Sequence, residues 1–228
     1  MSIILSIETA TQVCSVALHK DNKLIGAKEL LEDRSHSENL AVMIKDLLSL
    51  TGISVNDLSA VAVSKGPGSY TGLRIGVSTA KGLCYGLNIP LISVNSLLSM
   101  AYEVQGKNIH QYDLCPMLDA RRMEVYCLIT DYNLKIKRNT QALIIDESSF
   151  EAELSNASVL FFGNGMAKCR KILEKHNNAH FIVNIYPKAA NIGYLACEKY
   201  EIKDFENTET FEPFYLKDFI ATIPKKII

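Results

Sequence analysis

The stretch SKGPGSYTGLRIG, residues 64–76, decides how this chain folds. It follows an apolar run and places four glycines and a proline within thirteen residues. Three of the glycines have the spacing GxGxxxG, one residue longer than the dinucleotide-binding fingerprint, and the lysine of a Walker loop is missing. A strand that enters a helix through such a loop still leaves backbone N–H groups that suit an anion. The alternative is that Gly66, Pro67, Gly68 and Ser69 only form a tight turn.

The residues after the glycine loop predict a helix over 71–87. Gly72, Gly76 and Ala80 fall at i, i+4 and i+8, so one face of this helix carries almost no side chain. Glycine costs about 1 kcal/mol relative to alanine inside a helix. The smooth face either lets a partner helix approach closely or packs on the sheet of its own domain. Arg74 opposes the helix dipole in the first turn, so we expect it to reach an acid or anion, or to form a surface salt bridge.

On either side of this helix, strand and helix patterns alternate. We expect strands at 2–8, 13–19, 23–30, 59–64 and 91–94, and helices at 36–50, at 71–87 and from 95. After the polar stretch QGKNIHQYD (105–113), a candidate linker, nearly the same order of elements returns. This predicts a duplicated α/β unit of βββαβα type. The expected domains are residues 1–104 and a smaller unit, 105–228, whose tail folds back over the first.

The predicted helix 36–50 carries more apolar residues than one core-facing stripe requires. These residues are Leu40, Ala41, Val42, Met43, Ile44, Leu47, Leu48 and Leu50. The surplus suggests a second buried face, which would meet a partner together with the helix after the glycine loop. The predicted interface residues are His36, Leu40, Met43, Leu47, Gly72, Arg74, Gly76 and Ala80. Ser35 and Glu38 predict a capping box at the start of the helix.

Composition restricts the classes of function. The chain has 228 residues, 48% hydrophobic and 21% charged, which is enough to bury a real core. Its formal net charge of −1 argues against a generally basic nucleic-acid-binding surface. No segment has the pattern of a signal peptide or a membrane span. The six cysteines include no CxxC pair, and they predict reduced, buried thiols in a cytoplasmic protein.

Four motifs resemble one known family in their order and spacing. They are ILSIETATQVCSVAL (4–18), HSENL (36–40), GPGSYTGLRIG (66–76) and DARRMEVY (119–126). The chain is similar to the TsaB family, also called YeaZ, along its whole length and most strongly in its first half. Its tail, PFYLK, resembles the family's proline-tyrosine-arginine ending, with Lys217 where arginine is usual.

The resemblance implies the actin-like, Hsp70-like (ASKHA) superfold, built from two ribonuclease-H-like domains. It also implies a non-catalytic scaffold subunit of bacterial tRNA threonylcarbamoyladenosine synthesis. There the paralogue TsaD transfers threonylcarbamoyl to the adenosine beside the anticodon, TsaE is an ATPase, and TsaB binds and supports TsaD. We therefore expect a TsaD-like partner, a TsaE-like ATPase and tRNA reached through the complex, and a homodimer when the chain is alone. No cofactor is expected on the chain itself, and a nucleotide at the partner interface is left open.

Residues that would carry chemistry are missing or altered. TsaD-like proteins bind a metal through two histidines four apart on a helix, whereas here Leu40 follows His36 at that spacing. His176 and His180 are also four apart, but HNNAH is typical of a loop. We therefore expect no metal. The alternatives to a scaffold are an actin-like small-molecule kinase and a metallopeptidase-like hydrolase.

Three further features have two interpretations each. Glu8 follows the first strand, where actin-like kinases keep a carboxylate near the nucleotide's metal, or else it is bonded within its own turn. FFGNGMA (161–167) is the segment nearest to an adenosine loop, but its glycines more simply mark a turn from strand to helix. Arg121 and Arg122 lie either in a hairpin turn or in contact with a phosphate or a partner.

Overall fold

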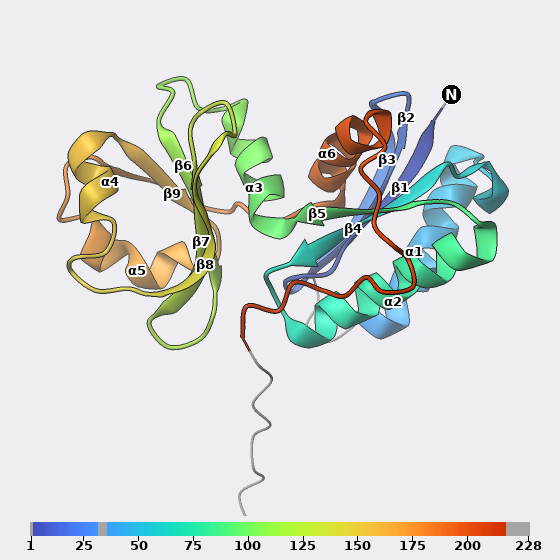
Figure 1. Cartoon of the computed structure of the whole chain (residues 1–228), viewed down its shortest axis with the longest axis horizontal. Helices are drawn as coiled ribbons and strands as arrows, with labels where there is room; N and C mark the ends of the chain where they lie inside the picture. The colour runs from blue at the N-terminus through green and yellow to red at the C-terminus, as the bar shows by residue number, and fades with distance from the viewer. Residues whose placement is uncertain (1, 32–35, 218–228) are drawn as a thin grey trace, which may run out of the picture.

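The computed structural model describes residues 2–31 and 36–217 and places them in two lobes, each built on a five-stranded sheet (Figure 1). The first repeat consists of β1 (Ile3–Glu8), β2 (Val13–Lys20), β3 (Lys23–Leu31), α1 (His36–Thr51), the 3-10 helix η1 (Val55–Asp57), β4 (Ala60–Gly66), α2 (Tyr70–Leu87), β5 (Leu91–Asn95) and α3 (Ser96–Gln105). The predicted capping residue Ser35 and the last part of the tail, 218–228, lie outside the described residues.

The sheet of the first lobe has the strand order β3-β2-β1-β4-β5. β1, β2 and β3 form an antiparallel meander, and β4 and β5 continue parallel to β1. Alternate residues of β1 point to opposite faces of the sheet. Ile3, Leu5 and Ile7 pack on the side of α1 and α2, whereas Ile4 packs on the other side. Both faces are therefore covered, and the turn from β4 to α2 lies at the end of the central strands.

The second repeat has the same order of elements. It consists of β6 (Asp113–Asp119), β7 (Glu124–Thr130), β8 (Ile136–Ile144), α4 (Glu151–Asn156), β9 (Val159–Phe162), α5 (Met166–Leu173), β10 (Ala179–Ile182) and α6 (Ala189–Glu201). Its sheet has the order β8-β7-β6-β9-β10, which corresponds strand for strand to the first. The duplicated βββαβα unit predicted from the sequence is therefore confirmed.

The last helix of each repeat packs on the sheet of the other repeat. Leu97 and Met100 of α3 pack with Leu114 of the second sheet. Ile192 and Ala196 of α6 pack against the face of the first sheet that is opposite α1 and α2. The structure therefore differs from the predicted division between residues 104 and 105. The apolar face of α6 complements the first sheet, so this helix belongs to the first lobe although it follows the second sheet in sequence.

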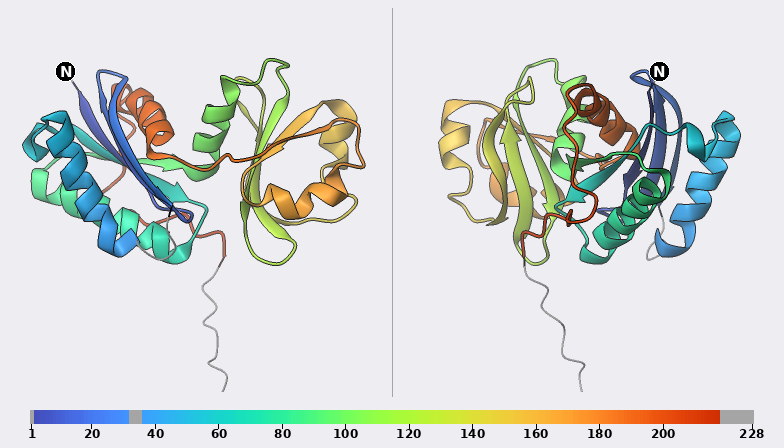
Figure 2. Two further views of the ribbon diagram at one scale, coloured as in Figure 1. Left: turned by 180° about the vertical axis from the view of Figure 1, so that it is seen from behind. Right: turned by 45° about the vertical axis from the view of Figure 1, so that its right-hand side comes forward.

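After α6 the chain runs back along the first lobe, past β5 and α2, to the space between the lobes (Figures 1 and 2). Glu206 forms a bridge with Leu91 at the edge strand β5. Further along, the N–H of Phe214 donates to Lys65 O over 2.7 Å. Within the described part of the chain, no helix combines the length and the apolar character needed to cross a membrane.

Candidate functional site

The glycine turn, residues 66–69, joins β4 to α2 and presses against the turn between β1 and β2. Gly66 has a φ of +108°, which favours glycine. The N–H of Ser69 donates to Ala10 O over 2.7 Å. A Cβ atom on Gly68 would lie under 3.0 Å from the same oxygen. The Ser69 hydroxyl accepts from the N–H of the third helical residue and so caps α2. The N–H groups of Ser69 and Gly72, which could have bound an anion, therefore donate to acceptors within the chain.

The smooth face of α2 packs on its own lobe, not on a partner. Gly72, Gly76 and Ala80 are all buried. A Cβ atom on Gly72 would lie under 3.0 Å from the backbone oxygen of Thr9, and one on Gly76 equally close to the Thr9 hydroxyl. The close approach of α2 to the β1–β2 turn explains both glycines. The prediction that these three residues form a partner interface is therefore corrected.

The interface residues predicted on α1 are buried in the same lobe. Leu40, Met43 and Leu47 are 1%, 6% and 2% exposed and belong to the core beneath the first sheet. His36 is 7% exposed, and its ring Nε2 lies 2.8 Å from Thr11 O. These four side chains stabilise the monomer, so the interface prediction is corrected for them too. The sequence correctly showed that α1 has a surplus of apolar residues. The residues that it assigned to the outer face of the helix are the buried ones.

The faces of α1 and α2 that point to solvent carry other residues. On α2 they include Ser78, Gly82, Tyr85 and Gly86, and Tyr85 is 83% exposed. Apart from the neighbouring backbone of α2 itself, no atom of residues 2–31 and 36–217 lies within 4 Å of a Cβ placed on Gly82 or Gly86. On α1, Val42 is 54% exposed. The two helices lie side by side on the outside of the first lobe (Figures 1 and 2). The sequence signal for this face is a second pair of glycines at i, i+4, which the predicted interface did not include.

Arg74 is an exposed residue of α2. Its contact differs from the acid, anion or surface salt bridge that the sequence predicted. Its Nη1 donates to the Tyr70 hydroxyl over 3.2 Å. Its guanidinium also lies over the ring of Tyr70, 5.5 Å from the centroid. The partner of Arg74 is thus an aromatic ring one helical turn earlier, at the mouth of the space between the lobes.

Glu8 ends β1 and is fully buried. Its Oε1 accepts from the N–H of Ala10 over 2.6 Å and from the Ser64 hydroxyl over 2.8 Å. Burial raises the pKa of the carboxyl to about 7, against the lowering effect of these hydrogen bonds. Of the two interpretations of Glu8, the structure supports the residue bonded within its own turn. A buried carboxyl of this kind does not face a space where a nucleotide's metal could lie.

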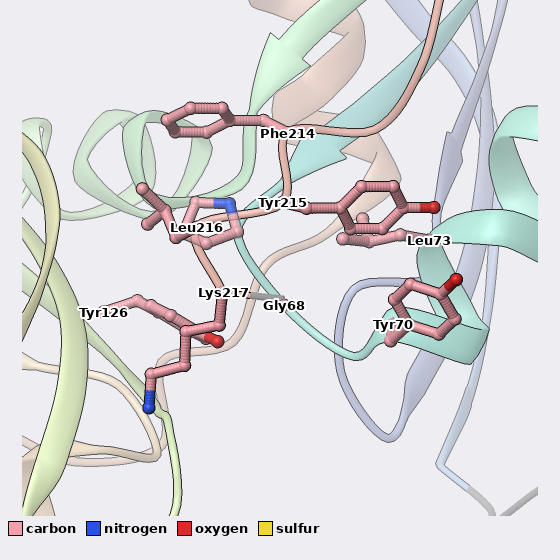
Figure 3. Close-up of a pocket in the computed structure, with 9 residues that line it drawn as sticks. Gly68, Tyr70, Leu73, Tyr126, Phe214, Tyr215, Leu216 and Lys217 are labelled. Atoms are coloured by element: carbon pink, nitrogen blue, oxygen red, sulfur yellow. The ribbon is translucent and has the colours of Figure 1, made fainter. Parts of the chain in front are cut away.

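The space in front of the glycine turn does not fit a nucleotide. Tail residues occupy it and leave a cavity of about 40 Å³, lined among others by Gly68, Tyr70, Tyr126 and Tyr215 (Figure 3). Such a volume holds only a few water molecules. The backbone oxygen of Phe214 would lie 3.0 Å from a Cβ on the first glycine of the turn. We therefore assign no nucleotide chemistry to this cleft.

The histidines of HNNAH do not share a helix. His180 lies in β10, where its ring stacks on Tyr112 at a centroid distance of 4.3 Å, and His176 lies in the turn before that strand. Among residues 2–31 and 36–217, no group of three histidine, cysteine, aspartate or glutamate side chains is placed to hold a metal ion. The absence of a metal stays a prediction. All six cysteines are free and buried.

Arg121 and Arg122 lie in the turn between β6 and β7, as the hairpin interpretation predicted. Both have positive φ, +69° and +49°, and both are exposed. Lys217 reaches this hairpin from the tail. Its Nζ pairs with the Glu124 carboxylate and lies 3.4 Å from Ala120 O.

Two repeated sheets with exchanged last helices define a protein of the actin-like ASKHA class. YeaZ from Pseudomonas aeruginosa has this fold, with a TM-score of 0.81 over 95% of this chain and 100% of that chain at 23% identity. A second Pseudomonas aeruginosa structure, described as similar to peptidase YEAZ, gives 0.83 over 95% and 100% at 24% identity. The activator of 2-hydroxyisocaproyl-CoA dehydratase from Clostridium difficile gives 0.50 over 90% and 98% at 11% identity. At these identities the likeness is one of fold alone.

The sequence comparisons are more specific. Residues 29–225 match the family model TsaD, tRNA N6-adenosine threonylcarbamoyltransferase. The biosynthesis protein TsaB of Buchnera aphidicola subsp. Baizongia pistaciae is 31% identical over 96% of this chain and 99% of its own. TsaB of Haemophilus influenzae is 29% identical over 96% and 94%. The alignment with TsaB of Escherichia coli, 42% identical, spans about half of each chain, 54% and 52%. The chain therefore belongs to the TsaB family of tRNA threonylcarbamoyladenosine biosynthesis proteins, within the broader TsaD family.

Proposed function

We propose that this chain is a non-catalytic subunit that binds a TsaD-like paralogue and supports it during threonylcarbamoyl transfer to the adenosine beside the anticodon. The observation that carries the proposal is the open face of α2. In the described part of the chain, Gly82 and Gly86 have no neighbour outside their own helix backbone within 4 Å of a Cβ, unlike the two glycines earlier in the helix. Glycine inside a helix costs about 1 kcal/mol relative to alanine, and the monomer gains no packing from these two.

A partner helix would pack on the open face of α2. Small residues let two helices approach closely, and the ring of Tyr85, 83% exposed, offers apolar area beside them. Val42 on the neighbouring α1 adds a second exposed apolar side chain. A TsaD-like paralogue of related fold would present a similar pair of helices. A second copy of this chain would do the same, so the homodimer and the heterodimer would compete for one surface.

The same proposal assigns no reaction and no cofactor to the isolated chain. The buried Glu8 and the filled space before the glycine turn both argue against a kinase-type site. A nucleotide at the interface with the partner is compatible with the proposal, because the outer face of α2 lies apart from that filled space. The TsaE-like ATPase and tRNA would be reached through the complex, since the formal net charge is −1. The place of action proposed is the cytoplasm.

The test is a pair of matched substitutions on exposed helix positions. Gly82→Leu adds a side chain to the open face of α2, and Ala152→Leu adds one to the exposed face of α4 in the second lobe. We expect Ala152→Leu to keep the wild-type melting temperature and Gly82→Leu to keep or slightly raise it, because leucine is a better helix former than glycine. Gly82→Leu should lose capture of the TsaD-like paralogue and shift to monomer in sedimentation, whereas Ala152→Leu should do neither. A folded Gly82→Leu variant that still captures the paralogue would place the interface elsewhere.

The non-catalytic part of the proposal has its own measurement. The purified chain, given the threonylcarbamoyl-adenylate and tRNA, should form no modified adenosine. Adding the TsaD-like paralogue should restore the product. Product formed by the chain alone would overturn this part and leave the interface result untouched.

A further inference from the structure

Among residues 2–31 and 36–217, two sets of contacts on different elements connect the two lobes. The first is a hinge formed by the exchanged helices α3 and α6. Glu103 of α3 accepts from Lys188 Nζ and from Asn191 Nδ2, both over 3.2 Å. At the start of α3, Asn95 Nδ2 donates to the Thr140 hydroxyl of the second sheet over 2.9 Å. The second set belongs to residues 204–217, here called the strap.

The strap is held to the first lobe along most of its length. The N–H of Glu206 donates to Leu91 O of β5 over 2.9 Å. Lys81 of α2 then reaches over the strap, and its Nζ donates to Glu209 O over 3.1 Å and to Phe211 O over 3.0 Å. These anchors use backbone groups of the strap, so they fix its path whatever side chains it carries.

At the glycine turn the strap crosses the space between the lobes (Figure 3). The N–H of Phe214 donates to Lys65 O over 2.7 Å. The ring of Tyr215 packs on that of Tyr70 at a centroid distance of 4.9 Å. The strap therefore covers the turn that, in the sequence, had the form of an anion-binding loop.

The attachment to the second lobe is short by comparison. The Lys217 ammonium pairs with the Glu124 carboxylate, lies 3.4 Å from Ala120 O and sits 5.9 Å from the centroid of the Tyr126 ring. The Lys217 side chain is 37% exposed and that of Glu124 22%. An exposed ion pair of this kind shifts an equilibrium by about fivefold at most. The strap is thus tied firmly at one end and weakly at the other.

We propose that the strap sets the angle between the two lobes and acts as a latch that opens at Lys217. With the latch closed, the lobes are connected at the α3–α6 hinge and again at the Lys217–Glu124 pair. With it open, only the hinge remains, the lobes turn about it, and the cavity in front of Gly68 widens. The small size of the Lys217 attachment makes the open state accessible to a partner that competes for Glu124 or for Lys217.

The test measures the distance between the lobes in the full chain. Spin labels are placed on Asn56→Cys in the first lobe and Lys171→Cys in the second, since both positions are exposed and all native cysteines are buried. The parent should give one narrow main distance distribution with at most a minor component at a second distance. Adding Lys217→Ala should raise the population of that component by up to about fivefold. Lys175→Ala is the matched control, because it removes an ion pair with Glu147 inside the second lobe.

Two further measurements keep the proposal falsifiable. Exchanging the charges, Lys217→Glu with Glu124→Lys, should restore the narrow distribution that either single change broadens. Hydrogen exchange at the Phe214 amide should stay slow in Lys217→Ala, because its bond to Lys65 O belongs to the part of the strap that remains attached to the first lobe. Faster exchange without a change in the distance between the labels would overturn the proposal, because the strap would then fray without setting the angle. Glu124→Gln repeats the test from the other side of the pair.

Discussion

In the first repeat β4 enters α2 through Gly66 and Gly68, and in the second repeat β9 enters α5 through Gly163 and Gly165. The first glycine of each pair has positive φ, +108° and +101°. The second glycine of each pair lies so close to the hairpin of its own repeat that a Cβ would come under 3.0 Å from backbone atoms. Two turns that share no other residue type thus share their glycines for one packing reason. The GxG spacing here serves the junction of hairpin and helix and carries no evidence for a phosphate site.

The helices that follow these turns differ. α2 has 18 residues and α5 has 8. Of these two helices only α2 contains glycines, and the first two of its four, Gly72 and Gly76, face Thr9 in the β1–β2 turn. The long helix must pass over this turn, and a side chain at either position would push it away. The face that the sequence suggested for a partner is thus a place of close packing inside the first lobe.

The sharpest test of this comparison sets two glycines of α2 against each other. Gly72→Ala puts a Cβ against the backbone oxygen of Thr9, which cannot move without disturbing the sheet. We expect it to lower the free energy of unfolding by about 3–4 kcal/mol. Gly82→Ala, in the same helix with open space around it, should raise the stability by up to about 1 kcal/mol. Urea denaturation of both variants measures the difference, and equal effects would refute the packing account.

The equivalent glycines of the two turns allow the next test. Gly163→Ala combines a strained φ with a Cβ under 3.0 Å from Met117 O, and it should cost about 3 kcal/mol. At Gly66 the nearest atoms, in Leu73 and Phe214, would lie at 3.0 Å. Gly66→Ala should therefore cost less, about 1–2 kcal/mol. Thermal melts of both variants rank them, and a reversed order would mean that the second turn can relax where the first cannot.

The sequence predicted the elements better than it predicted the faces they bury. Strand alternation and turn residues gave both βββαβα repeats, because these signals are local. The exchange of α3 and α6 between lobes is not local, and nothing in either helix states which sheet it covers. The same limit applies to the site. Leu40 and Val42 are both apolar, and only the position of the sheet decides that the first is 1% exposed and the second 54%.

Each repeat ends its first strand with a carboxylate, Glu8 in β1 and Asp119 in β6, and the two should affect the pH dependence of stability differently. Glu8 has a folded-state pKa of about 7, above its ordinary 4.5, so the folded state binds more protons between these values and loses stability as the pH rises. Burial lowers the pKa of His19 from 6.5 to about 4, which has the opposite sign over nearly the same range. In the wild type these two effects of pH on the free energy of unfolding oppose each other.

Glu8→Gln should remove the loss of stability with rising pH that Glu8 causes. The amide oxygen can still accept from Ala10 and Ser64, and no charge needs to be buried. We expect the variant to gain about 2–3 kcal/mol at pH 8, from 1.36 kcal/mol per unit of pKa. Below pH 6.5 its stability should fall towards pH 4, as His19 alone requires. Urea midpoints from pH 4 to 8 test this, and a pH profile parallel to that of the wild type would contradict the assignment to Glu8.

The smallest effect belongs to the other carboxylate. Asp119 ends β6 and is about half exposed, and Lys168 of α5 pairs with it. Partial burial alone would raise the pKa of Asp119, but the hydrogen bond and charge of Lys168 outweigh it and hold the pKa below 3.8. The stability from this pair is therefore present above pH 3.8 and lost as the pH falls. Lys168→Met should cost less than about 1 kcal/mol at pH 7, and less in high salt, because the pair is exposed.

A matched control separates the charge of Lys168 from its packing. Lys171→Met removes an exposed lysine from the same helix and should change nothing measurable. As the pH falls through the lowered pKa of Asp119, the cost of Lys168→Met should shrink to what remains of its hydrogen bond with Glu124 O, 2.7 Å long. A cost that does not change with pH would assign the whole effect to that backbone contact. Glu8 and Asp119 would then differ only in burial. Glu8, at the end of β1, has no cation beside it among the residues that the structure describes, and its raised pKa lets it bind a proton instead.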